Sequence, residues 1–135
     1  MIEFDPIKGG SILAIAGPLK HLHFICSDPF FNKDTGAVSV VAVNISSVKE
    51  GRPYDNTCML DKGDHPFIRH LSYVYYKEAV IFRVEKIKYG IEAGDIKVLE
   101  KATEPVINRV ISGFFKSKFT SRKIIKALEL GGVRK

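Results

Sequence analysis

The segment DKGDHPFIRHLSYVYY, residues 61–76, carries the densest group of reactive side chains in the chain, with His65, Arg69 and His70 inside six residues. Cleavage of RNA without a metal ion, by attack of a ribose 2′-hydroxyl, needs a base, an acid and a cation beside the phosphorane. Histidine suits the first two roles because its ordinary pKa is about 6.5. The arginine fork matches phosphate oxygens. The segment therefore predicts His65 and His70 as acid–base residues and Arg69 as a phosphate clamp.

Hydroxyl, ammonium and imidazole groups nearby would bind the substrate of such a site. Ser72, Tyr73 and Lys77 continue the same segment. His21 and His23 share one face of a predicted strand, because alternate residues of a strand point the same way. We expect these five residues to contact RNA if that strand runs alongside the segment.

Structural interpretations of the same residues stay open. His65 precedes Pro66 and is typical of a turn residue whose ring caps a backbone group. Arg69 would pair with Asp61 or Asp64 across a hairpin, which contributes little to stability when the pair is exposed.

The tyrosines of the segment divide between two faces. Alternation places Tyr73 and Tyr75 on one face and Tyr76 on the other. At least one of them is therefore expected in the core, and the others are free to stack on bases.

Metal and nucleophile chemistry have weaker signals. His21 and His23 with His65 or His70 would supply three imidazoles, as in a zinc site. However, Cys26 is out of phase with the pair, and no carboxylate stands at a typical ligand spacing, so two exposed strand histidines are the better interpretation. No Gly-x-Ser-x-Gly or phosphate-cradling glycine motif is present. We expect no metal and no cofactor.

Strands and then helices must position these groups. β-branched and alternating runs predict strands, and 37–47 (AVSVVAVNISS) is the longest apolar, β-branched run. Apolar spacing and capping residues predict two helices, the first with Thr103 as N-cap and the second capped by Thr120 or Ser121. The predicted strands cover 10–17, 21–27, 37–47, 57–60 and 71–87 (the last broken near Lys77-Glu78), the loops 27–36 and 48–56, and the helices 103–119 and 120–132.

The 135 residues suit a single domain, and their net charge of +6 is uneven. From Arg109 onward there are eight Lys or Arg against one acid, so residues 1–108 carry a net charge of −1. Such a basic end suits a polyanion, with RNA or DNA in the first place. A solvated helix face is an equally good interpretation.

Location is predicted from what the chain lacks. No run approaches the roughly 18 apolar residues of a membrane span, and the acidic start MIEFDP does not resemble a signal peptide. Cys26 and Cys58 lie in apolar runs without a neighbouring histidine, which is typical of buried free thiols in a reducing compartment. We therefore expect a cytoplasmic protein with no membrane partner.

Several short motifs follow one another in a fixed order. Ser27 ends a strand before Phe31-Asn32, the pair Ser46-Ser47 ends the next strand, and EPVINRVISGFF opens a terminal helix. This order resembles that of the PemK/MazF-like toxins. The resemblance covers residues 9–117. It implies an SH3-like barrel, mainly β in an α+β fold, with five to seven strands over about 9–92 and C-terminal helices over about 103–130, all in one domain. It also implies that Ser46, Ser47 and Ser72 position RNA.

The chain departs from the family where the family's chemistry lies. In place of a glycine-rich loop with Arg-Pro it has AGPLKHLH, with Lys20 and His21 near the Arg-Pro position. The positions of the catalytic Arg and Asp fall near Val74 and Tyr76, which cannot perform those roles. The family's chemistry has then either moved to neighbouring side chains, with residues 61–76 as the expected place, or been lost.

The resemblance implies a toxin that cleaves single-stranded RNA without a metal, with an antitoxin protein as partner and a homodimer as the assembly. Two alternatives stay open. One is a non-catalytic nucleic-acid binder that uses the basic end and the tyrosines. The other is an interaction protein that uses the apolar stripe of residues 106–115.

Overall fold

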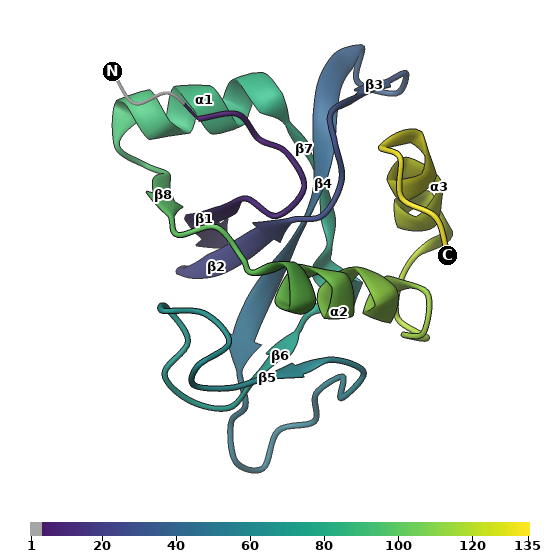
Figure 1. The fold of residues 1–135 in the computed structure, drawn as a ribbon. Helices are drawn as coiled ribbons and strands as arrows, with labels where there is room; N and C mark the ends of the chain where they lie inside the picture. The colour runs from purple at the N-terminus through teal and green to yellow at the C-terminus, as the bar shows by residue number, and fades with distance from the viewer. Residues whose placement is uncertain (1–3) are drawn as a thin grey trace.

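The run AVSVVAVNISS forms the longest strand, β4 (Ala37–Ser47), and this strand organises the sheet. β-branched residues favour the extended backbone, and residues 40–45 are buried on both faces of the strand. The computed structural model describes residues 4–135. β4 runs through the middle of the fold in Figure 1.

Eight antiparallel strands form the sheet within the described residues, in the pairing order β5-β6-β4-β2-β1-β8, with β3 and β7 also paired to β4. Ala42 of β4 pairs with Ile25 of β2 and with Val80 of β7, so these two strands lie on opposite edges of β4. The other strands are β1 (Ser11–Ala16), β2 (Leu19–Ile25), β3 (Phe30–Asn32), β5 (Met59–Leu60), β6 (Ser72–Val74), β7 (Val80–Arg83) and β8 (Lys97–Leu99).

Helices cover both faces of the sheet. The larger apolar core joins Phe24 and Val43 to α2 (Glu104–Phe114) and α3 (Arg122–Leu130). A smaller core joins Ile12 and Val40 to α1 (Val84–Ala93). In Figure 1, α1 and α3 accordingly lie on opposite sides of β4. A short 3₁₀ turn, η1 (Tyr76–Glu78), separates β6 from β7.

Much of the predicted order is confirmed. The structure is α+β and mainly β. The strands predicted over 10–17, 21–27 and 37–47 are β1, β2 and β4, and the C-terminal helices are α2 and α3. Thr103 is the N-cap of α2 without a side-chain hydrogen bond, whereas the Oγ of Ser121 accepts a hydrogen bond from the amide of Ile124 at 3.2 Å. The break predicted near Lys77-Glu78 is η1.

The prediction of strand over 71–87, broken near Lys77-Glu78, is wrong at its C-terminal end, because α1 begins at Val84. Val84, Ile87 and Ile91 all contact the smaller core, and their spacing is helical. Gly94 ends the helix in the left-handed conformation at φ 83°. β8 was not predicted, and β3 lies inside the predicted loop 27–36.

Among residues 4–135 the strand count is eight in place of five to seven, because two short strands that were not predicted, β3 and β8, join the sheet. Within residues 4–135 the sheet stays open, since β5 and β8 stand at the ends of the pairing path and do not pair with each other. Cys26 and Cys58 are buried free thiols, as predicted. None of the helices in the described part of the chain is long and apolar enough to cross a membrane.

Candidate functional site

An open cavity of about 860 Å³ lies where the turn between β1 and β2 meets the end of β4. Residues 16–22 line it, together with residues from 45–54 and 66–73 and with Tyr75 and Glu78. Of the predicted site residues, it brings together His21, Ser46, Ser47, Arg69, His70, Ser72 and Tyr73.

His70 is held at the end of β4. The Oγ of Ser47 lies 2.7 Å from the Nε2 of His70, and the ring is exposed toward the cavity that both residues line. The Oγ of buried Ser72 donates a hydrogen bond to the carbonyl of His70 at 2.9 Å. Since Ser72 pairs with Ser47 across β6 and β4, one strand pair fixes both the backbone and the ring of His70.

His21 approaches the same strand end from β2. Its Nδ1 lies 3.3 Å from the carbonyl oxygen of Ile45, and the ring is half-buried. A carbonyl only accepts, so Nδ1 carries the hydrogen, and the Nε2 of neutral His21 keeps its lone pair. Ile45 and Ser47 are two residues apart, or about 6–7 Å along a strand. Both imidazoles are therefore anchored at neighbouring points of β4 and line one cavity.

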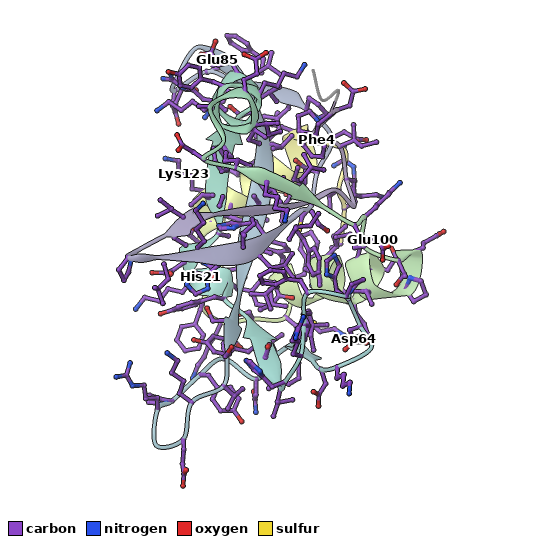
Figure 2. The ribbon with its side chains drawn as sticks, turned by 90° about the vertical axis from the view of Figure 1, so that its left-hand side faces the viewer. Phe4, His21, Asp64, Glu85, Glu100 and Lys123 are labelled. Atoms are coloured by element: carbon purple, nitrogen blue, oxygen red, sulfur yellow. The ribbon has the colours of Figure 1, made fainter. Side chains whose placement is uncertain are left out.

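His65 lies outside this cavity and has both ring nitrogens engaged. The amide of Phe67 donates to its Nδ1 at 3.0 Å, and its Nε2–H donates to the carbonyl of Glu100 at 2.6 Å. The ring is 4% exposed and packs edge-on against Phe24. In Figure 2, Asp64 and Glu100 lie on the opposite side of the molecule from His21. The contacts of His65 are those of a turn residue, and they leave no nitrogen free for acid–base chemistry.

His23 and Lys77 do not line the cavity either. The expectation of two exposed histidines on this strand is wrong for His23, which is 4% exposed because its strand segment pairs with both β1 and β4. Burial lowers the pKa of His23 despite the hydrogen bond from its Nδ1 to the carbonyl of His21 at 2.9 Å. His21 remains open to the cavity because the β2–β4 pairing begins only at His23. Lys77 is exposed on η1.

Arg69 is exposed on the cavity wall and does not pair with Asp61 or Asp64. Asp64 instead accepts from the backbone amide of Asp61 at 2.8 Å and from Arg109 at 3.4 Å. The guanidinium of Arg69 therefore has no ion pair among residues 4–135.

Three tyrosines form a row along the cavity. The Tyr73 ring lies 5.5 Å from the Tyr54 ring and 5.4 Å from the Tyr75 ring. Tyr76 takes the other face, as alternation predicts, and its buried hydroxyl donates to the carbonyl of Val110 at 2.6 Å. Burial in the core raises the pKa of Tyr76 far above its ordinary value. The row leaves aromatic surface at a cavity wall, where unpaired bases can stack.

The charged groups of the cavity are mostly basic. Lys20, Lys49, Arg52 and Arg69 line it, against one acid, Glu78. None of these cations forms an ion pair with another described residue. A concave surface with excess charge of one sign concentrates ligands of the opposite sign.

The basic C-terminal helix is separate from this cavity, since no residue of α2 or α3 lines it. Lys49, Arg52 and Tyr54 were missed by the sequence interpretation, which placed them in a loop without function. The sequence signal that could have indicated them is the presence of two cations and a tyrosine directly after the central strand. Within the described residues no three His, Cys, Asp or Glu side chains are grouped closely enough to bind a metal ion, so the three-imidazole arrangement is not formed.

No protein-family model, curated protein or solved structure matches this chain. The functional interpretation therefore rests on the residues that line the cavity.

Proposed function

We propose that the cavity binds single-stranded RNA and cleaves it by metal-independent transesterification. The observation that carries the proposal is that His21 and His70 are both anchored to the end of β4 in one basic cavity. This arrangement replaces His65 with His21 as the second acid–base residue and keeps Arg69 as the phosphate clamp.

The chemistry uses groups at stated atoms. The Nε2 of neutral His21 takes the proton of a ribose 2′-hydroxyl, whose oxygen attacks the adjacent phosphorus. The bond from phosphorus to the 5′ oxygen breaks, and protonated His70 gives its proton to that oxygen. Arg69 neutralises the non-bridging oxygens of the phosphorane. The products are a 2′,3′-cyclic phosphate and a 5′-hydroxyl end.

The cavity supports a single-stranded substrate. Its volume lies in the upper part of the range of about 300–1,000 Å³ for ligand pockets. The tyrosine row of Tyr54, Tyr73 and Tyr75 suits bases that are free to leave a stack, and four cations suit the backbone. Ser46, Ser47 and Ser72 also line the cavity, and their hydroxyls already hydrogen-bond to the Oδ1 of Asn44, the Nε2 of His70 and the carbonyl of His70. They therefore support the wall of the site.

The finer fold assignment belongs to the same proposal. We propose that the sheet is an SH3-like barrel of the PemK/MazF type that is left open, which is supported by the pairing of β4 with four other strands, β2, β3, β6 and β7. A toxin role, an antitoxin that covers the cavity, a homodimer and a cytoplasmic location follow from that resemblance.

A non-catalytic binder of RNA or DNA is the second candidate. One observation favours it: the Nε2 of His70 is already in contact with the Oγ of Ser47, so this nitrogen is not free to exchange a proton with RNA. In that case the tyrosines and cations would hold a strand, and no bond would break.

The test is cleavage of an end-labelled single-stranded RNA in excess chelator, with analysis of the product ends. We expect 2′,3′-cyclic phosphate ends from the native protein and at least a 100-fold loss in His21→Asn and His70→Asn. Arg69→Ala should lose activity, whereas Arg122→Ala, a matched arginine on α3 outside the cavity, should not. Binding without cleavage would establish the second candidate in place of the first, and absence of binding would overturn both.

A further inference from the structure

Glu78 is the one acidic residue that lines the cavity. It is exposed at the end of η1 and has no ion pair within residues 4–135. A carboxylate repels phosphate, so a surface built only to hold an RNA backbone would be better without it. Its presence therefore points to a part of the ligand that donates hydrogen bonds.

The tyrosine row lies beside this carboxylate. Tyr73 stands between Tyr54 and Tyr75, with interplanar angles of 30° and 56°. The backbone amide of Glu78 donates to the carbonyl of Tyr75 at 3.0 Å, and Glu78 lines the same cavity as the three rings. Burial raises the pKa of the Tyr73 hydroxyl, and the negative charge of Glu78 adds to that effect. One end of the cavity thus combines aromatic surface with a hydrogen-bond acceptor.

We infer that this end of the cavity is a nucleobase subsite in which Glu78 selects guanine. Guanine presents two parallel donors, N1–H and N2–H, and two parallel donors match the two oxygens of a carboxylate. The ring stacks on the tyrosine row while its edge meets Glu78. This inference rests on the proposed binding of single-stranded RNA.

The other bases fit a carboxylate less well. Cytosine and adenine offer an amino group beside a ring acceptor, so one carboxylate oxygen would face a lone pair. Uracil offers a single N–H between two carbonyls. We therefore expect the order guanine first and uracil last.

The experiment measures fluorescence anisotropy of labelled pentamers UUXUU, with X as G, A, C or U, in excess chelator. All residues carry 2′-O-methyl groups, so that no pentamer can be cleaved. We expect the native protein to bind the G pentamer about tenfold more tightly than the U pentamer, a ratio in the range of one bidentate base contact. Glu78→Gln should reduce that ratio to about one, because an amide offers only one acceptor, and should leave binding of the U pentamer unchanged or stronger.

Two variants separate the possible outcomes. Glu92→Gln, an equal charge change at an exposed residue of α1, should retain the tenfold preference. Tyr54→Leu should weaken all four pentamers alike. If all four bind equally to the native protein, or if Glu78→Gln keeps the preference, the base subsite is overturned while RNA binding stands. If no pentamer binds, the proposed function and the subsite both fail.

Discussion

The Oγ of Ser47 and the Nε2 of His70 lie 2.7 Å apart, although 23 residues separate them in the chain. Ser47 is the last residue of the central strand, and His70 stands two residues before its partner strand β6. The contact fixes the ring of an otherwise exposed side chain. Side chains held in this way reach a reacting atom in one geometry rather than several.

Replacement of Ser47 should affect cleavage more than binding. In Ser47→Ala the His70 ring loses its fixed orientation, so we expect kcat to fall about tenfold while KM changes less than twofold. Ser47→Thr keeps the hydroxyl and should restore most of the rate. Steady-state cleavage of a labelled RNA measures both constants. Equal losses in the alanine and threonine variants would contradict a positioning role for the hydroxyl.

Acid should destabilise the protein partly through His23. Burial lowers the pKa of His23 in the folded state. Below about pH 6.5, His23 therefore binds a proton in the unfolded chain more readily than in the folded chain. Stability is therefore present above that pH and is lost as the pH falls, by up to about 1.4 kcal/mol per pH unit from this group. Urea unfolding at pH 7.5 and 5.5 measures the loss, which should be smaller in His23→Gln. An equal loss in both proteins would show that His23 does not contribute.

Local patterns predicted the parts of the fold that local chemistry determines. The valine run of β4 was predicted with its observed bounds, 37–47, and alternation separated Tyr76 from Tyr73. α1 was missed because its β-branched residues directly follow β7, so that a strand and a helix share one apolar run. Only the positive φ at Gly94 marks its end.

The site depended on contacts between distant residues. Nothing in the order of the residues indicates that His65 bonds to the carbonyl of Glu100, 35 residues away, or that His21 reaches Ile45. Arg52 and Tyr54 were missed for the same reason, because their loop is held by a hydrogen bond from Ser117, a residue distant in the chain, to Asp55. Sequence spacing therefore pointed to a segment that partly lines the cavity, but not to which of its histidines faces that cavity.

Packing of Tyr76 against α2 leaves no room at Gly113. A Cβ there would lie 1.9 Å from the hydroxyl oxygen of Tyr76, which donates to the carbonyl of Val110. We expect Gly113→Ala to lower the free energy of unfolding by about 3 kcal/mol or more. Tyr76→Phe in the same chain should recover part of that loss, because the two replacements share one contact. Ser112→Ala, an exposed neighbour, is the control, and strict additivity in urea unfolding would contradict the clash.

The loop that carries Arg52 and Tyr54 is tied to the end of α2. The carboxylate of Asp55 accepts from the Oγ of Ser117 at 2.6 Å and from the amide of Thr57 at 3.0 Å. Burial opposes the charge on Asp55, but these hydrogen bonds outweigh it and hold the pKa of the carboxyl below its usual range. The charged form of Asp55 therefore fixes the loop.

Loss of the hydrogen bond between Ser117 and Asp55 should weaken RNA binding, although neither residue lines the cavity. Ser117→Ala removes a hydroxyl that donates a hydrogen bond to the carboxylate of Asp55, so we expect the free energy of unfolding to fall by about 1–3 kcal/mol. Because Arg52 and Tyr54 are then free to leave the cavity wall, RNA affinity should fall several-fold although Ser117 itself lies outside the cavity. Urea unfolding and anisotropy titration with 2′-O-methyl RNA measure the two effects, with Ser112→Ala as the control and Ser117→Thr as the conservative replacement. A loss of stability with unchanged affinity would show that the loop does not contribute to binding.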